Sequence, residues 1–376
     1  MAGIYLHIPF CKQACHYCNF HFSTSIKQKE RMLLAMKKEI EMRQNELPKI
    51  PLESIYFGGG TPSLLSPEEI TLLLESIARH YTIAEKAEIT LEMNPDDFRV
   101  NYLEELKSAG INRLSIGVQS FFDDELEFMN RAHQAEDVFR LLQAVSKNFD
   151  NFSIDLIYGI PGSSVARWRE NIDMALSYSP THVSSYALTV EPKTVLAHQV
   201  KQGTIELLDE TVVAQQFDVL VEVLMHNGYE HYELSNFGKP HFHSVNNSAY
   251  WEGKPYLGIG PSAHSFFKNQ RSWNIQNNQK YMKGIETGFL QRETEQLSKI
   301  DQYNEYIMTG LRTSRGVSLE AIELRFGKNF SDLLEQQAEK HLFNQHLFWD
   351  GDVLKVTQKA KFLVDGIASD LFLIQF

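Results

Sequence analysis

The chain has 376 residues, with 36 Lys and Arg against 48 Asp and Glu, which leaves a formal net charge of −12. Its composition, 43 % apolar and 22 % charged, is that of an ordinary globular protein and excludes a mainly disordered chain. The acidic balance also argues against a protein whose main task is to hold a nucleic-acid backbone, because that task needs a concentrated basic surface. No nucleic-acid partner is therefore expected.

As far as about residue 190, short β-branched or aromatic runs alternate with longer segments of helical periodicity. This alternation predicts parallel strands joined by right-handed crossovers, in an open doubly wound sheet or in a full or partial barrel. Both architectures gather binding groups at the carboxyl ends of the strands. The predicted strands are Ile4–Ile8, Ser54–Phe57, Glu88–Met93, Arg113–Gly117, Phe152–Leu156 and His182–Ala187. The predicted helices lie near residues 26–46, 67–80, 99–109, 134–147 and 164–178.

The pattern changes after residue 190. A long helix is predicted over about 205–227, and a region rich in Gly, His and aromatic residues follows it as far as Trp273. That region predicts loops and short strands rather than further strand and helix units. We therefore expect it to be an extension of the preceding sheet.

The C-terminal part has a third pattern, which begins near residue 296. Short helices are predicted near 300–312, 318–326 and 331–341, and the run HLFWDGDVLKVT predicts a hairpin with Asp350-Gly351 at its turn. Helices followed by a small β-wing are typical of winged-helix modules. Such modules most often bind DNA, but in an acidic chain a role in binding protein or covering a ligand fits at least as well.

Cys11, Cys15 and Cys18 are all the cysteines of the chain, and they follow the first predicted strand. A disulfide framework needs an even number of cysteines spread along the chain, so a shared ligand is expected instead. Thiolates favour zinc or an iron–sulfur cluster, and a cubane cluster on three thiolates keeps one iron open for an outside ligand. Three buried apolar cysteines are the remaining interpretation. Zinc would need a fourth ligand, for which the candidates are His7, His16 and His21.

The spacing Cys-x3-Cys-x2-Cys, preceded by YLHIPF, resembles the signature of the radical S-adenosylmethionine (SAM) superfamily. The resemblance implies a (β/α)6 barrel with a 4Fe-4S cluster on Cys11, Cys15 and Cys18, and SAM bound at the open iron. In that superfamily, an electron delivered to the cluster can cleave SAM and release a deoxyadenosyl radical. An electron donor for the cluster is therefore an implied partner.

The sequence FGGGTPS follows the second predicted strand, where glycines let the backbone approach a ligand without interference from Cβ. By resemblance, Gly59, Gly60 and Thr61 belong to the loop that holds the amino end of SAM. A tight turn without a ligand is the alternative interpretation. The position after a strand, next to a cysteine loop that also follows a strand, favours the ligand.

Polar residues also end the next three predicted strands, and their position favours contact with one shared ligand. The alternative is that they cap the following loops or helices. Arg131 has a guanidinium fork that suits the carboxylate of SAM, and a surface salt bridge is its alternative role. By resemblance to the coproporphyrinogen-oxidase-like branch, the polar SAM-contacting positions are Glu92, Gln119, Arg131 and Asp155. Tyr5 and Ala187 match positions near the cluster or SAM, and Tyr17 matches an aromatic residue that packs on adenine.

The resemblance continues through YALTVEP (186–192), YLGIGPSAHSF (256–266) and EYIMTGLRTSRGV, and it covers nearly the whole chain. These segments are similar to the HemW-type heme chaperones and to the oxygen-independent coproporphyrinogen III oxidases. The oxidase carries a further Cys two residues after the third ligand, where this chain has Phe20, and a long extension before the first strand, which begins here by Ile4. Both features favour the chaperone.

HemW-type proteins carry an HNxxYW motif whose His is proposed to help bind heme, and the matching position is Asn246. An amide is a poor iron ligand compared with imidazole, so axial ligation by this residue is in doubt. His241 and His243 stand upstream as substitutes, although a loop histidine is usually solvated. Tyr250 and Trp251 would stack on a porphyrin unless they are core residues. His264, within GPSAHSF, is expected near the cluster or in the core.

The predicted architecture is α/β, with an incomplete (β/α)6 radical-SAM barrel over 1–190, a middle extension over 191–295 that completes the pocket, and a winged-helix-like HemN/HemW-type domain over 296–376. The expected function is binding of heme and its delivery to acceptor proteins such as respiratory enzymes. The alternative is an oxygen-independent coproporphyrinogen III oxidase that makes protoporphyrinogen IX by SAM radical chemistry. A third hypothesis is a protein that senses SAM or the cluster without heme.

The expected location of the protein is the cytoplasm. The apolar runs are much shorter than the ~20 residues that a membrane-spanning helix needs. The first ten residues, MAGIYLHIPF, lack a basic leader and a small-residue cleavage site, so no secretory signal is predicted. Peripheral association with a membrane is compatible with this expectation.

Overall fold

A computed structural model describes residues 2–374 of the chain. Its centre is a sheet of six parallel strands that lie side by side in chain order, as predicted. They are β1 (Ala2–Ile8), β2 (Leu52–Gly59), β3 (Ile83–Met93), β4 (Arg113–Gln119), β5 (Phe152–Tyr158) and β6 (His182–Ala187). In β1, Ile4, Leu6 and Ile8 are fully buried in the core, whereas the alternate residues Tyr5 and His7 line cavities on the other face.

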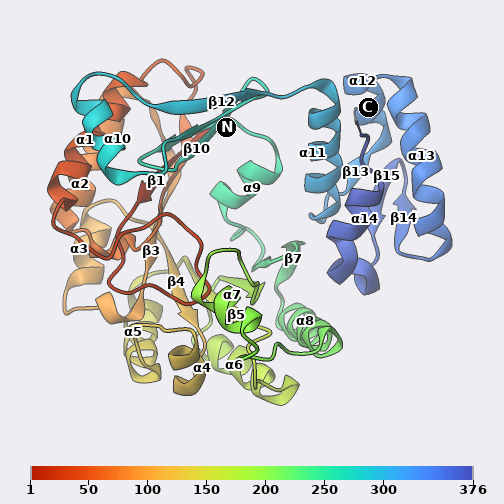
Figure 1. Ribbon diagram of the computed structural model, residues 1–376, viewed down its shortest axis with the longest axis horizontal. Coiled ribbons are helices and arrows are strands. Elements are labelled where there is room, and N and C mark those ends of the chain that lie inside the picture. The colour runs from red at the N-terminus through yellow and green to blue at the C-terminus, as the bar shows by residue number, and fades with distance from the viewer. Residues whose placement is uncertain (1, 375–376) are drawn as a thin grey trace.

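The five predicted crossover helices are confirmed, and Figure 1 shows most of them along the outer side of the sheet. The second begins with a capping box in which Ser66 and Glu69 bond each other's backbone N–H groups. The five are α1 (Lys29–Met42), α2 (Pro67–His80), α3 (Tyr102–Ser108), α5 (Ala135–Asn148) and α6 (Val165–Ser177). The sequence did not predict three short elements: the 3-10 turns η1 (Pro62–Leu64) and η2 (Pro95–Asp97) and helix α4 (Asp123–Phe128).

The middle of the chain extends the sheet beyond β1. Strand β9 (Tyr256–Ile259) pairs with β1 in parallel, and β10 (His264–Phe267), β11 (Gln270–Asn274) and β12 (Arg292–Gln296) follow in antiparallel order. At the opposite edge, β8 (Asn236–Gly238) pairs with β6 in the antiparallel sense.

Strand β7 (Glu230–Glu233) is the last strand at this edge and pairs with β8. Within residues 2–374, no strand pairing joins β7 to β12 at the far edge, so the barrel is open, as predicted.

The expectation of loops and short strands between the long helix and Trp273 was incomplete. The long helix is α8 (Glu210–His226), and α7 (Val195–Lys201) precedes it. Helix α9 (Val245–Trp251) lies inside the region predicted to lack helices, and its first turn is closed by Ser244, whose side chain accepts a hydrogen bond from the Asn247 N–H. Helix α10 (Asn278–Glu286) packs against α1.

The C-terminal elements form a separate body beside the barrel, coloured blue in Figure 1. The predicted helices and hairpin are confirmed, and Gly351 at the turn has a φ of +65°. The unpredicted strand β13 adds a third strand to the hairpin. The elements are α11 (Lys299–Leu311), β13 (Val317–Ser318), α12 (Leu319–Phe326), α13 (Lys328–Phe343), β14 (Leu347–Asp350), β15 (Val353–Val356), η3 (Gln358–Leu363) and α14 (Val364–Asp370).

Buried apolar side chains form one large cluster around the sheet of the barrel and another large cluster inside the C-terminal body, and a third, small cluster contains Leu126, Met129, Ile157 and Ile160. Two cores are consistent with the predicted division of the chain, whose boundaries at 190 and 295 stay predictions. Residues 1, 375 and 376, which the predicted domains include, lie outside the described residues. None of the helices in the described part of the chain is both long and apolar enough to cross a membrane.

Candidate cofactor-binding site

Two adjoining cavities share part of their lining. The cysteine cavity, of about 560 Å³, is lined by all three cysteines and by residues from each of the strands β1 to β6. The outer cavity, of about 900 Å³, is lined by residues of β1, β10 and the end of α9 on one side and by residues of the C-terminal body on the other. The residues that line both cavities are Tyr5, Asn19, Phe20, Gly59 and Tyr250.

The loop after β1 carries the three cysteines, and each is half-buried. The backbone N–H of Cys11 donates to Ser23 O over 3.1 Å, and that of Cys18 donates to Cys15 O over 3.3 Å. Burial raises the pKa of Cys11 to about 11 and also raises the pKa of Cys18. Raised pKa values argue against a nucleophilic role, whereas a metal centre would stabilise the thiolates. The interpretation as apolar core residues is wrong, because all three are half-buried and line a cavity instead of packing in the core.

The zinc interpretation does not fit the geometry. Across residues 2–374, no three His, Cys, Asp or Glu side chains converge as ligands for a single metal ion. Each candidate fourth ligand has one ring nitrogen engaged: His7 Nε2 lies 2.8 Å from His21 O, His16 Nδ1 lies 3.0 Å from Phe128 O, and His21 Nε2 lies 2.7 Å from Asn278 Oδ1. Three half-buried thiols on one cavity instead fit a 4Fe-4S cluster, which takes three thiolates and leaves room for an outside ligand.

The glycine-rich loop after β2 lies directly against the cysteine loop. Gly60 N donates to Ile8 O over 2.9 Å, and Thr61 N donates to Phe10 O over 2.7 Å. A Cβ at Gly60 would lie 2.6 Å from Phe10 O, a distance that no side chain tolerates. The absence of a side chain at Gly60 therefore allows the two loops to meet, and both contribute to the wall of the cysteine cavity.

Two carboxylates from neighbouring parts of the sheet lie on the cysteine cavity. Glu92, in β3, accepts hydrogen bonds from the Tyr56 hydroxyl over 2.9 Å and from Gly59 N over 3.2 Å. Asp155, in β5, accepts from Ser115 Oγ over 3.1 Å. Burial raises the pKa of Glu92 to about 7 and that of Asp155 to about 6. These groups change charge close to neutral pH in a cavity that has room for a ligand.

The structure brings together all ten residues predicted to contact SAM, because each lines the cysteine cavity. Gln119 lies there with a φ of +67°, at the end of β4. None of the three strand-end residues serves as a helix cap: the residues that precede the following elements are Asn94, Phe122 and Ser164. The capping alternative is therefore wrong for Glu92, Gln119 and Asp155. SAM contact by these ten residues stays a prediction.

Arg131 is half-buried at the cysteine cavity and makes no salt bridge among the described residues, so the surface salt bridge is also wrong. Its Nη2 atom donates to Asn94 Oδ1 over 2.7 Å and to Gly117 O over 2.9 Å, and its Nη1 atom donates to Cys15 Sγ over 3.4 Å. Its Nε atom is buried without a partner among the described residues. A guanidinium with a spare buried donor on this cavity suits an anionic ligand.

The residues around Asn246 are divided between the cavities. Asn246 is buried on the cysteine cavity, Trp251 lines the outer cavity, and Tyr250 lines both. The structure brings neither His241 nor His243 to these cavities. His241 lies in an exposed turn with a φ of +71°.

His243 has partners elsewhere. Its Nε2 atom lies 2.8 Å from Glu230 Oε2, and its ring stacks on Tyr232 with a centroid distance of 4.2 Å. Both upstream histidines therefore lie outside the two cavities.

Sequence reasoning missed most of the outer cavity. His264 was expected near the cluster face or in the core, and it lies instead on the outer cavity with an exposed side chain. Arg271, Tyr306 and Arg315 also line this cavity, and the sequence pattern did not single them out as site residues, because they come from β11, α11 and the turn after α11. Only the folded arrangement of the barrel and the C-terminal body brings them together.

Comparison with known proteins identifies relatives along the whole chain. A model of the radical SAM superfamily matches residues 5–175, and a model of the HemN C-terminal domain matches residues 297–363. The heme chaperone HemW of Bacillus subtilis is 34 % identical over 352 residues, which are 92 % of this chain and 93 % of that protein. The heme chaperone HemW of Lactococcus lactis is 33 % identical over 373 residues, which are 96 % of this chain and 97 % of that protein.

Among solved structures, coproporphyrinogen III oxidase (HemN) from Escherichia coli has the same fold. The TM-score is 0.85 at 23 % sequence identity, and the match covers 99 % of this chain and 90 % of that one. At this identity the match concerns the fold alone. It agrees with the predicted α/β architecture of an open radical-SAM barrel and a C-terminal body.

Proposed function

The chain belongs to the HemW heme chaperone family within the radical SAM superfamily, and we therefore propose that it binds heme and delivers it to acceptor proteins. The observation that carries this proposal is the pair of adjoining cavities. One is lined by three cysteines and a glycine-rich loop, and the other is larger, aromatic and open. The first suits a resident cofactor, and the second suits a flat cargo that has to enter and leave.

The cofactors implied by the family are a 4Fe-4S cluster and SAM. In this proposal Cys11, Cys15 and Cys18 hold the cluster, and Arg131 binds the carboxylate of SAM. When bound, the cluster supplies a low-potential electron and an open iron site. The role proposed for cluster and SAM is to regulate assembly or the transfer of heme.

Further SAM contacts are proposed from all around the cavity. The loop at Gly59, Gly60 and Thr61 is proposed to bind the amino end of SAM, because backbone can approach a ligand closely there. The side chains proposed to line the rest of the SAM site are Tyr5, Tyr17, Glu92, Gln119, Asp155 and Ala187.

Oxygen-independent oxidation of coproporphyrinogen III is the second candidate function. The shared wall favours it, because a porphyrinogen in the outer cavity would lie beside a radical source in the cysteine cavity. Phe20, where the oxidase has a further cysteine, speaks against it. We therefore rank heme delivery first, with acceptor proteins such as respiratory enzymes as the proposed partners and an electron donor serving the cluster.

Anaerobic reconstitution of the cluster, followed by titration with heme, tests the proposal. SAM cleavage and coproporphyrinogen III turnover are assayed on the same preparation. Stoichiometric heme binding without porphyrinogen turnover supports the chaperone. Turnover to protoporphyrinogen IX without stable heme binding identifies the oxidase, and failure to bind heme together with failure to turn over contradicts both functions.

A further inference from the structure

The outer cavity has the size and lining of a site for a flat aromatic anion. Its volume of about 900 Å³ lies within the range of ligand pockets. Trp251 and Tyr306 supply aromatic surface, and Tyr250 and Phe20 supply more where the cavity meets the cysteine cavity. Phe20 is 66 % exposed, so a ligand that covers it removes apolar surface from water.

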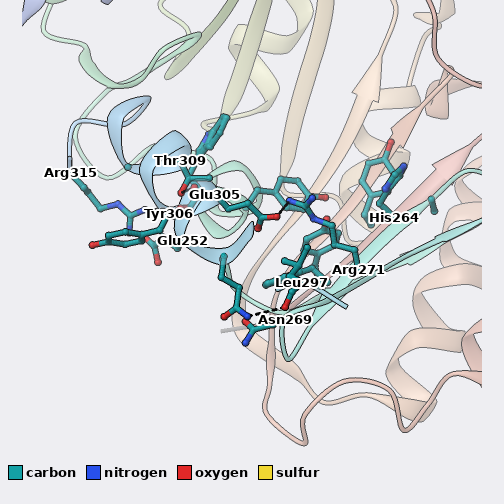
Figure 2. A pocket seen from close by; sticks show the side chains of 18 of the residues that line it. Glu252, His264, Asn269, Arg271, Leu297, Glu305, Tyr306, Thr309 and Arg315 are labelled. Carbon is teal, nitrogen blue, oxygen red and sulfur yellow. Dashed lines mark hydrogen bonds and ion pairs between the residues drawn. The ribbon is translucent and has the colours of Figure 1, made fainter. Parts of the chain in front are cut away.

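The charged residues of this cavity are unlike those of the chain as a whole. Three arginines and two glutamates line it, without Lys or Asp, although the net charge of the chain is −12. Arg271 pairs with Glu305 over 2.6 Å, and Arg315 lies 3.5 Å from Glu252. Figure 2 shows Arg271 near His264 and Arg315 on the far side, beside Tyr306.

Both arginines have donors to spare. The side chains of Arg271 and Arg315 are 43 % and 51 % exposed, and a guanidinium has five N–H donors. The glutamate beside each arginine therefore leaves donors free for a carboxylate of a ligand.

Among the histidines of this cavity, His264 alone has both ring nitrogens without a hydrogen-bond partner in the part of the chain that the structure describes. The Nε2 atom of His7 lies within hydrogen-bond distance of His21 O, and the Nε2 atom of His21 lies within that distance of Asn278 Oδ1. The ring of His264 stacks on Trp273 with a centroid distance of 5.8 Å, which limits its rotation. Burial and Arg271 also lower the pKa of His264, which keeps the imidazole in the neutral form that binds metals.

We propose that heme binds in the outer cavity with His264 as the axial ligand of its iron and with Arg271 and Arg315 as the partners of its propionates. This inference rests on the heme-carrying function proposed above. It accounts for Asn246, because that residue lies on the cysteine cavity and is not needed for ligation in the outer cavity. Iron ligation then depends on β10 instead of the loop before α9.

The test is a titration of the full-length, cluster-reconstituted chain with iron protoporphyrin IX, followed by the Soret band, in wild type, His264→Ala and His264→Gln. We expect both variants to lose the histidine-ligated Soret band and to bind heme about tenfold more weakly or worse. Added imidazole restores the band in His264→Ala. Circular dichroism checks that the variants fold, which the exposed position of His264 favours.

The exposed His226, which lines neither cavity, provides the matched control, and His226→Ala keeps the wild-type spectrum. Iron-free protoporphyrin IX is titrated in parallel, because it has no iron and needs no axial ligand. We expect His264→Ala to bind it like wild type. The double variant Arg271→Ala, Arg315→Ala is expected to bind both porphyrins more weakly. An unchanged Soret band in His264→Ala, or its loss in His243→Ala, overturns the assignment of His264 while heme carriage stands. Absence of binding of either porphyrin to wild type defeats the proposed function itself.

Discussion

Arg131 donates a hydrogen bond to the sulfur of Cys15 over 3.4 Å, and the same side chain also bonds Asn94 and Gly117 O. Nowhere in residues 2–374 does a carboxylate come within ion-pair distance of it. The guanidinium is thus fixed in the wall of the cysteine cavity by neutral partners, and its charge is left for a ligand of that cavity.

Replacing Arg131 by Lys tests this role. A lysine keeps the charge but cannot reproduce a fork that bonds Asn94, Gly117 O and Cys15 together. We expect Arg131→Lys to bind SAM about tenfold more weakly while it still takes up iron and sulfide. Calorimetric titration of the reconstituted protein measures the affinity, and Arg140→Lys, on the exposed side of α5, is the control. Wild-type affinity for SAM in Arg131→Lys would rule out the carboxylate contact.

Replacing the cysteines tests the cluster assignment. Changing Cys11, Cys15 and Cys18 together to Ser should abolish the brown absorption and the iron content of the reconstituted protein. The fold should survive, because the cysteines are half-buried in a loop and outside the main core. Absorption spectra, iron analysis and circular dichroism measure the three properties. A full complement of iron in the triple variant would refute the ligand assignment.

Adding one methyl group at Gly60 should disturb the cysteine loop. The new Cβ would lie 2.6 Å from Phe10 O and 2.7 Å from Ile8 O, both of which are backbone atoms that cannot move independently. We expect Gly60→Ala to lower the free energy of unfolding by roughly 1 to 3 kcal/mol and to reduce cluster uptake. Gly366→Ala is the matched control, because a Cβ there meets nothing within 4 Å and lies in helix α14. Equal stability of the two variants, by urea unfolding, would contradict the steric argument.

The buried carboxylates predict a pH dependence of the apo chain. The folded-state pKa of Glu92 is raised to about 7 from 4.5, so between these values the folded chain keeps a proton that the unfolded chain has lost. The free energy of unfolding therefore falls as the pH rises through this range, by roughly 1 to 3 kcal/mol. Glu92→Gln should flatten that decline, although Asp155 still contributes below about pH 6.

Denaturation with urea at several pH values measures this decline. The control is Glu170→Gln on the exposed face of α6, which should leave the slope unchanged. If the slope of Glu92→Gln equals that of wild type, the burial of Glu92 does not govern its protonation.

The sequence predicted the parts of the fold whose local pattern is strong. All six parallel strands were found because each is a compact β-branched run between helices of at least seven residues. Helix α4 has only six residues, so it does not show a repeating apolar stripe. The cysteines and the strand-end polar residues could be predicted to meet because parallel strands bring their carboxyl ends to one edge.

The outer cavity could not be predicted in the same way. His264 stands on the antiparallel strand β10, Arg271 on its neighbour β11, and Arg315 beyond α11, and their proximity depends on how the C-terminal body sits against the barrel. His241 and His243 look equally suited to ligation in the sequence. The structure distinguishes them from His264, since β7 and its neighbours hold His243 beside Glu230 and Tyr232.

Phe20 is a side chain through which the two cavities meet. Phe20 follows Cys18 by two residues and lines both spaces. Coupling between two binding sites is reciprocal. If a ligand of the cysteine loop changes the affinity of the outer cavity for its own ligand through Phe20, a ligand in the outer cavity changes the affinity of the loop by the same factor. Oxidative loss of a metal centre from this loop would then change the affinity of the outer cavity for its ligand. A ligand bound in the outer cavity would in turn change how readily the metal centre is lost.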